Sequence, residues 1–279
     1  MIIALKNLVF LLWQDLINLI HIFEPHDSAP SIHNHSKELR KAGIIKISDF
    51  LVPDFSDNLR NEIELLANTY KDSIELENGT KLNYRNQNNA DGSDHGMLDI
   101  SHVQNSITSI SQIDQKYLIQ IIKSTSGQEV IPLRANAYLN IGVKNTRGYH
   151  LDNVQPVIYK AFIYLSDVPD ITYGPYSFIR NSHRFCLYSY FNIIRNLFIQ
   201  GNKSTDMPWF SRKNVEHCTG KKGDLILSNQ NAIHRGLAQE VGKKRVAIIL
   251  SFMVKSKLSY MHNSAKDNIK NSIAHTSNK

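Results

Sequence analysis

The pattern of apolar and polar residues changes along the chain, and its first half has helical periodicity. In residues 52–70 the apolar side chains recur every three or four positions, which predicts an amphipathic helix. These side chains are Leu59, Ile63, Leu66 and Tyr70. Residues 111–124 predict another helix, and a short helix that stops at Gly43 leads into a strand at 44–47. We therefore expect the helices to gather in the first half of the chain.

From residue 130 onward the pattern becomes that of β-strands. The segment RANAYLNI (134–141) alternates strictly between polar and apolar residues. One face would carry Arg134, Asn136, Tyr138 and Asn140. Three further runs have the composition of strands: VIYKAFIYLSDV (157–168), GDLILS (223–228) and RVAIILSFMV (245–254). Strands and helices do not alternate, which argues against Rossmann and TIM-barrel folds. The sequence predicts an α+β protein with a mainly β core, built as an antiparallel sandwich.

The first 23 residues form an apolar segment that differs from the rest of the chain. Four of its polar residues fall on one narrow stripe of a helical wheel: Asn7, Gln14, Asn18 and His21. The segment makes a poor signal peptide and is too interrupted for a comfortable transmembrane span. We expect an extra N-terminal helix over residues 1–23. Two hypotheses remain for it: it packs on the domain or on a partner subunit, or it lies in a membrane interface.

The remaining chain divides by composition. Residues 24–36 are rich in Pro, Ser, Asn and His, which predicts a linker. Residues 37–258 contain the periodic segments and are expected to form the main domain. Residues 259–279 form a basic polar tail that we expect to be flexible.

Composition and charge narrow the classes of partner. The chain has 279 residues, 42% of them hydrophobic and 20% charged, which suits a globular protein with a core. The net charge of +7 favours anionic partners, and no motif for nucleic-acid binding accompanies it. Two distant cysteines, Cys186 and Cys218, indicate a reducing compartment. We expect a cytoplasmic protein that contacts the inner face of a membrane if residues 1–23 bind lipid.

A histidine and an aspartate two residues apart suggest a metal site. His150 and Asp152, in the sequence GYHLDN, point the same way if the chain is extended. A 2-His-1-carboxylate iron site needs a third ligand, and His234, just past a predicted strand, is the best candidate. Arg245 follows 11 residues later in an apolar strand, where its guanidinium fork would suit a dicarboxylate. The pair alone is weak evidence for an iron site. The pair followed in order by His234 and Arg245 is much stronger evidence.

The sequence around these residues resembles one family of oxygenases. The segments YKAFIYLSDVPDITYGPYSFIRNSHR (159–184) and GKKGDLILSNQNAIHRGLAQEVGKKRVAIILSF (220–252) resemble the phytanoyl-CoA dioxygenase family, as do RKAGIIKISDFLV and DHGMLDISH nearer the N-terminus. The resemblance spans roughly residues 37–255. It implies an Fe(II)- and 2-oxoglutarate-dependent oxygenase that uses O₂, on a double-stranded β-helix (jelly-roll, cupin-like) fold flanked by helices.

The resemblance also implies roles for single residues. His150, Asp152 and His234 fall on the positions of the iron ligands, and Arg245 falls on the arginine that pairs with the distal carboxylate of 2-oxoglutarate. Contacts with the co-substrate or the substrate are implied for Arg134 and Asn136. One departure is Gly236, where relatives often carry a hydroxyl that helps to hold the co-substrate. The carboxylate of Asp152 predicts hydroxylation rather than halogenation, because halogenating relatives lack it.

Several other residues have candidate roles. We expect substrate contacts from Tyr138, His95, Asp99 and His102, the last three of which could alternatively form a metal site. His183 is interpreted as structural. The insert 185–200 has apolar residues at helical spacing, namely Leu187, Tyr190, Ile194 and Leu197. This pattern predicts a helix packed on the barrel, and the alternative is a lid.

The predicted function is hydroxylation of an unactivated C–H bond, with release of succinate and CO₂. The substrate would be a small molecule, a lipid or a lipid-linked sugar, and the sequence does not distinguish among them. If the three ligands bind nothing, the alternative is a catalytically inactive, cupin-like binding protein of the same fold. Oligomeric state is left open.

Overall fold

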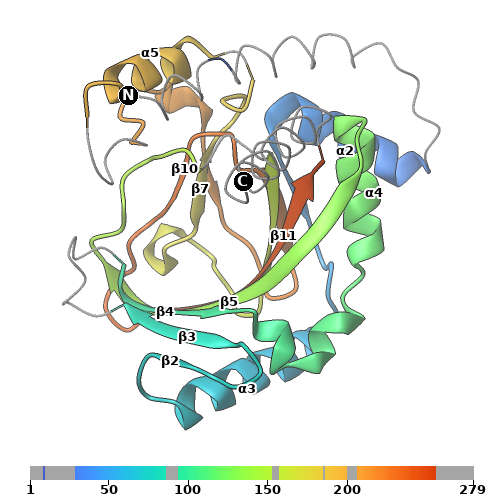
Figure 1. Cartoon of the computed structure of the whole chain (residues 1–279), viewed down its shortest axis with the longest axis vertical. Helices are drawn as coiled ribbons and strands as arrows, with labels where there is room; N and C mark the ends of the chain where they lie inside the picture. Colours follow the sequence, from blue (N-terminus) through green and yellow to red (C-terminus); the bar gives the residue numbers. More distant parts are fainter. Residues whose placement is uncertain are drawn as a thin grey trace, which may run out of the picture.

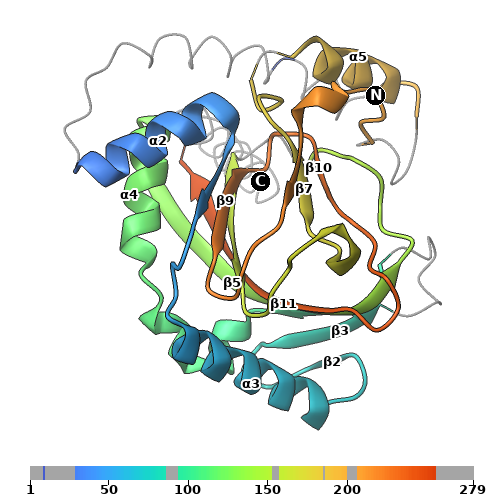
Figure 2. The same ribbon diagram turned by 180° about the vertical axis from the view of Figure 1, so that it is seen from behind.

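Two antiparallel sheets make up the core of the protein in the computed structural model (Figures 1 and 2). The structure describes residues 29–85, 94–152, 157–184, 186–199 and 206–255, together with Val9. The larger sheet has the order β1-β9-β6-β11-β5-β4-β3-β2, and the smaller has the order β10-β7-β8. The strands are β1 (Ile44–Ile47), β2 (Ile74–Glu75), β3 (Lys81–Arg85), β4 (His95–Ser101), β5 (Val130–Lys144), β6 (Ile158–Tyr164), β7 (Tyr176–Ile179), β8 (Val215–Cys218), β9 (Leu225–Asn229), β10 (His234–Gly236) and β11 (Lys244–Val254).

Helices cover the outside of the larger sheet. They are α2 (Pro30–Ala42), α3 (Pro53–Thr69) and α4 (Gln115–Ser126). A further helix, α5 (Leu187–Asn196), follows β7 in the chain and lies beyond the smaller sheet (Figures 1 and 2). Both views place α2 beside α4, whereas α3 lies at the end of the molecule opposite α5 (Figures 1 and 2). Mainly antiparallel strands with flanking helices confirm the predicted jelly-roll class.

The predicted linker 24–36 is wrong from residue 30 onward, because α2 begins at Pro30. Proline suits the first turn of a helix, where its missing N–H costs nothing. The helix buries Ile32 and Leu39, and its buried Ser36 accepts a hydrogen bond from the Ser124 hydroxyl of α4 at 3.1 Å. The polar residues that suggested a linker therefore lie largely on the outer face of this helix. The main domain includes this helix rather than starting at residue 37.

Other predicted segments lie outside the described residues. They are the N-terminal helix over residues 1–23, apart from Val9, and the tail 259–279. Within the described part of the chain, no helix combines the length and apolarity needed to span a membrane.

Residues in register on neighbouring strands point to the same face of a sheet, so their side chains form rows across the strands. Two such rows lie on the face of the larger sheet that is turned toward the smaller sheet. In one row Arg245 of β11 pairs with Asn140 of β5. Six residues further along β11, Ser251 lies between Arg134 of β5 and Lys160 of β6. These two rows place cationic side chains at opposite ends of the same face.

The helix α5 buries polar residues on its inner face and exposes two of its four predicted packing residues. Its buried residues are Ser189, Asn192, Ile193 and Asn196, and Leu187 and Ile194 are exposed. Tyr190 and Leu197 do pack against the core, as expected. The inner face is held by hydrogen bonds: the Asn192 amide donates to the carbonyl oxygen of Trp209 and accepts from the N–H of Trp209, and the Asn196 amide donates to the carbonyl of Asp206. Satisfied amides replace hydrophobic burial on this face.

Candidate metal centre

Backbone pairing brings the two histidines of the predicted site together. His234 begins the short strand β10, and His150 lies opposite it in the segment after β5. The N–H of each residue donates to the carbonyl oxygen of the other at 3.0 Å. Asp152 lies two residues beyond His150, so one short extended segment presents two of the three side chains.

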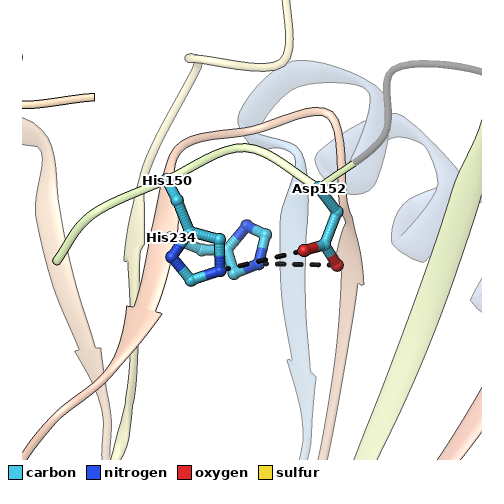
Figure 3. A group of neighbouring side chains, drawn as sticks. All are labelled: His150, Asp152 and His234. Atoms are coloured by element: carbon cyan, nitrogen blue, oxygen red, sulfur yellow. Dashed lines mark ion pairs between the residues drawn. The ribbon is translucent and has the colours of Figure 1, made fainter. Parts of the chain in front are cut away.

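The side chains converge with their ligand atoms facing one another (Figure 3). The Nε2 atoms of His150 and His234 each lie 3.8 Å from a different carboxylate oxygen of Asp152. One ligand atom from each residue lies within 4.8 Å of the other two. Among the described residues, this is the one cluster of histidine, cysteine or acidic side chains that could hold a metal ion.

Hydrogen bonds to carbonyl groups fix which nitrogen of each histidine faces the centre. The Nδ1 of His150 lies 2.8 Å from the carbonyl oxygen of Gly148, and the Nδ1 of His234 lies 2.8 Å from that of Ala232. A carbonyl oxygen only accepts, so each Nδ1 carries the proton and each Nε2 presents its lone pair to the centre. Second partners of this kind orient histidine ligands in metal sites.

Electrostatics set all three groups in the protonation state that binds a metal. Burial lowers the pKa of His150 to about 4, with the neighbouring His234 adding to the effect, and burial also lowers the pKa of His234. Burial raises the pKa of Asp152, but the Lys160 ammonium, 2.7 Å from its Oδ2, acts with the two neighbouring histidines to hold that pKa below its usual range. Two neutral imidazoles and one carboxylate are therefore available near neutral pH, and this donor set suits a divalent transition metal.

The three side chains and Arg245 line one cavity of about 580 Å³. Arg245 is buried, burial lowers its pKa, and its guanidinium donates to the carbonyl oxygen of Gly174. Within the described chain, no carboxylate lies at ion-pair distance from Arg245. Asn140, its neighbour in the row, also lines the cavity, and its buried Oδ1 has no hydrogen-bond partner. The Arg245 guanidinium can donate to a carboxylate ligand, whereas the Asn140 Oδ1 needs a donor such as a hydroxyl group. Either group is costly to leave without a partner in a buried site.

The structure separates the other predicted site residues. Tyr138 lines the same cavity as Arg245. Arg134 and His102 line a second cavity of about 520 Å³, and Asn136 lines neither. Arg134 and Asn136 therefore do not lie beside Arg245 on β5, where Asn140 takes that position.

The residues His95 and Asp99 lie on β4 and line neither of these cavities. Burial raises the pKa of Asp99, while Arg85, 3.9 Å away, acts in the opposite direction. The alternative metal site of His95, Asp99 and His102 does not form in the described structure, since the three do not cluster.

Sequence reasoning missed two residues of this region, Lys160 and Asn140. Lys160 is the one charged residue in the strand β6, and a charge in a strand so apolar was the available signal. Asn140 shares the polar face of β5 with Arg134, but only the strand register distinguishes which of them reaches Arg245.

Comparisons with known proteins show the fold. Neither a protein-family model nor a curated protein sequence matches the chain. Among solved structures, it is similar to SnoK, a non-haem α-ketoglutarate-dependent carbocyclase of nogalamycin biosynthesis, with 16% identity, coverage of 79% of this chain and 83% of SnoK, and a TM-score of 0.58. It is also similar to SnoN, a non-haem α-ketoglutarate-dependent epimerase of the same biosynthesis. The identity is 13%, the match covers 80% of this chain and 83% of SnoN, and the TM-score is 0.56.

A third similar structure contains ligands. HygX from Streptomyces hygroscopicus, crystallised with nickel and 2-oxoglutarate, is 12% identical, with coverage of 80% of this chain and 87% of HygX and a TM-score of 0.55. At such identities the three comparisons establish the fold that this chain shares with non-haem 2-oxoglutarate-dependent enzymes.

Proposed function

We propose that the protein is an Fe(II)- and 2-oxoglutarate-dependent dioxygenase that hydroxylates an unactivated C–H bond of an organic substrate. The observation that carries the proposal is the position of Arg245. A buried guanidinium that has no carboxylate at ion-pair distance in the described chain, although Asp94 in the same cavity acts on it electrostatically, lines the cavity of His150, Asp152 and His234. A metal at the three side chains and a dicarboxylate between that metal and Arg245 would satisfy both halves of the cavity.

The chain's own residues have distinct roles in this proposal. His150, Asp152 and His234 would hold iron through two imidazole nitrogens and one carboxylate oxygen, leaving the remaining positions open on one side. Arg245 would bind the distal carboxylate of 2-oxoglutarate through its fork, and the Nδ2 hydrogens of Asn140, its neighbour in the row, could donate to the same carboxylate. When bound, iron and 2-oxoglutarate supply the oxidation chemistry, with O₂ consumed and succinate and CO₂ released.

Buried phenols and aromatic rings form much of the remaining wall. Tyr138, Tyr164 and Tyr176 line the cavity, and burial raises the pKa of each, so all three stay protonated at neutral pH. The Tyr176 ring stacks on Phe162 at 4.4 Å between centroids and lies 5.5 Å from the ring of His234. The Tyr164 hydroxyl donates to the carbonyl oxygen of Cys218, and the Tyr176 hydroxyl accepts from Ser228 and Gln230. These rings give the cavity an apolar wall beside His234, which would help to exclude water.

The metal and the co-substrate can be tested without knowing the substrate. Anaerobic addition of Fe(II) and 2-oxoglutarate to the full chain should give the weak visible charge-transfer band of a chelated 2-oxo acid. The double variant His150→Ala, Asp152→Ala should lose the band while keeping the circular dichroism of the folded protein. If the wild-type protein gives no band, or the double variant retains it, the proposal is overturned in favour of an inactive binding protein with this fold.

The reaction outcome requires a separate experiment. The similar structures include an epimerase and a carbocyclase, so product analysis must distinguish oxygen insertion from both. With an identified substrate, a product that gains one oxygen atom derived from ¹⁸O₂ supports hydroxylation. A product of unchanged composition, or one that has lost two hydrogens, would show a different use of the same centre.

A further inference from the structure

A second cavity adjoins the metal centre on the side away from Arg245. It measures about 520 Å³ and shares three wall residues with the first cavity: Arg147, Asp152 and Lys160. Asp152 is thus the point at which both cavities reach the metal centre. A molecule in the second cavity would approach the metal from beside this carboxylate.

Basic residues dominate the polar part of this cavity. Arg134, Arg147 and Lys160 line it, and Asp152 is the one carboxylate among the described residues that do so. Arg134 and Lys160 flank Ser251 in one row across three strands. Since adjacent strands lie about 4.8 Å apart, the backbones of these two residues are separated by about 10 Å, a span that long side chains can close around a small anion.

The polar groups of this row have capacity for a ligand. Arg134 is exposed and acts electrostatically on Asp99, and among the described residues it forms no ion pair or hydrogen bond. The Ser251 hydroxyl likewise forms no hydrogen bond there. Lys160 contacts Asp152 at 2.7 Å through one of its three ammonium hydrogens. Together they offer a guanidinium fork, a hydroxyl and an ammonium from three adjacent strands.

The co-substrate of the proposed function cannot occupy both cationic ends of this sheet face. Arg245 and Ser251 are six residues apart on β11, which corresponds to about 20 Å along an extended strand. A five-carbon diacid is far shorter than this distance. The two ends must therefore serve two different anions, one at Arg245 and the other at the row of Arg134, Ser251 and Lys160.

Apolar residues complete the second cavity and define the rest of its ligand. Leu133, Leu151 and Ile158 line the same wall as the basic residues. We propose that this cavity binds the substrate as an organic anion, with a carboxylate or phosphate head at Arg134 and Ser251 and an apolar body against Leu151 and Ile158. That the ligand is a substrate rests on the proposed dioxygenase function, whereas the anion site itself rests only on the row and the cavity.

Binding of amphiphilic probes tests the site without iron or turnover. Octyl phosphate and octanoate are titrated into the metal-free full chain by calorimetry, with octylamine and octyl glucoside as cationic and neutral counterparts. We expect binding of at least one anion, and neither counterpart should bind comparably. Whichever anion binds more tightly identifies the preferred head group. Equal binding of all four probes would overturn the proposal.

Variants locate the binding within the molecule. Arg134→Gln should weaken binding of the preferred anion about tenfold or more, and Ser251→Ala should weaken it less. Arg212→Gln is the matched control, because it removes the same charge from an exposed position that lines neither cavity. Unchanged binding in Arg134→Gln, or an equal loss in the control, would contradict the assignment.

Competition separates this inference from the proposed function. Excess 2-oxoglutarate should leave the anion bound, and Arg245→Gln should not weaken it. Displacement by 2-oxoglutarate, with loss in Arg245→Gln, would place the anion in the first cavity and overturn the inference alone. Retained anion binding in a protein that gives no charge-transfer band would overturn the dioxygenase proposal and keep the anion site.

Discussion

His150 and His234 are backbone partners, and each donates its N–H to the carbonyl oxygen of the other at 3.0 Å. Their rings lie 4.7 Å apart between centroids. The separation of these two side chains is therefore fixed by main-chain pairing, and the rings are oriented by the carbonyl groups of Gly148 and Ala232. Such a pair is organised for metal binding before a metal arrives.

Removing one of these imidazoles should abolish tight metal binding. His234→Ala deletes a donor that no neighbouring histidine replaces in the described structure, so Ni(II) affinity should fall by more than the roughly 10- to 100-fold typical of outer-sphere changes. Calorimetric titration of Ni(II) measures this loss. The control is His183→Gln, which removes a buried histidine away from the centre and should bind Ni(II) like the wild type.

The strand and helix types were predictable because each element has its own hydrophobic period. The strand 44–47 and the long helix in 52–70 appear as β1 and α3. The order of His150, Asp152, His234 and Arg245 also sufficed to predict which side chains share a cavity. These features depend on local pattern or on chain order.

What the sequence did not predict depends on register and on polar burial. Whether Asn140 or Arg134 lies beside Arg245 is decided by how β5 pairs with β11, and a shift of six residues along the strand exchanges them. The orientation of α5 depends on hydrogen bonds from Asn192 and Asn196 to a segment that follows ten or more residues later. Hydrophobic periodicity carries no information about such bonds.

Arg245→Gln should separate metal binding from co-substrate binding. The substitution removes the charged fork but leaves the three metal-ligating side chains unchanged, so Ni(II) should still bind. The affinity of the Ni(II)-loaded protein for 2-oxoglutarate should fall about 10- to 100-fold, as expected for a lost charge-assisted hydrogen bond pair. Titration of 2-oxoglutarate with and without bound Ni(II) provides the measurement. Equal affinity in variant and wild type would remove Arg245 from the proposed site.

Gly236→Ser should strengthen co-substrate binding at little cost to stability. A Cβ at Gly236 would meet no atom within 4 Å, and the residue lines the cavity. The new hydroxyl can donate to a carboxylate held by Arg245, which should raise 2-oxoglutarate affinity roughly two- to tenfold. The free energy of unfolding should change by less than about 0.5 kcal/mol. A weaker affinity would mean that the open space is already used by the ligand.

His183 should make the metal-free protein less stable in acid. Burial lowers its pKa to about 4, and its Nε2 donates to the carbonyl oxygen of Arg40 at 3.0 Å. Between about pH 6.5 and pH 4 the unfolded chain binds a proton at this residue that the folded chain does not. As the pH is lowered from about 6.5 to 4, the free energy of unfolding should therefore decrease, by up to about 3 kcal/mol from His183 alone.

Chemical denaturation at several pH values measures this effect. His183→Gln retains an amide donor for the carbonyl of Arg40 but does not titrate, so its acid-side loss should be smaller by about the same amount. The comparison uses metal-free protein throughout, because a metal bound at His150 and His234 would add its own pH dependence to the stability. The lowered pKa values of these two histidines contribute equally to the variant and the wild type. Parallel pH profiles for the variant and the wild type would contradict the prediction.

On α5 the usual effect of polarity on stability should be reversed. Asn192→Leu makes the helix more apolar but leaves the backbone N–H and carbonyl of Trp209 without their partner, which should cost about 1–3 kcal/mol. Phe191→Gln, on the exposed face of the same helix, should change stability by less than about 0.5 kcal/mol. Urea denaturation of the pair is the measurement, and a neutral Asn192→Leu would show that the inner amides contribute little.

The pairing of β1 with β9 also has a consequence for the timing of folding. Ile44 is in register with Ser228, so one edge of the larger sheet closes across more than half of the chain. Contacts this distant in sequence carry a large entropic cost before they form, and proteins dominated by them fold slowly. During synthesis on the ribosome, β1 has no partner strand until residue 228 has been added. The edge of β6 that β9 will cover stays open over the last part of this interval. The nascent chain therefore passes through a stage at which both edges are available to chaperones or to other chains.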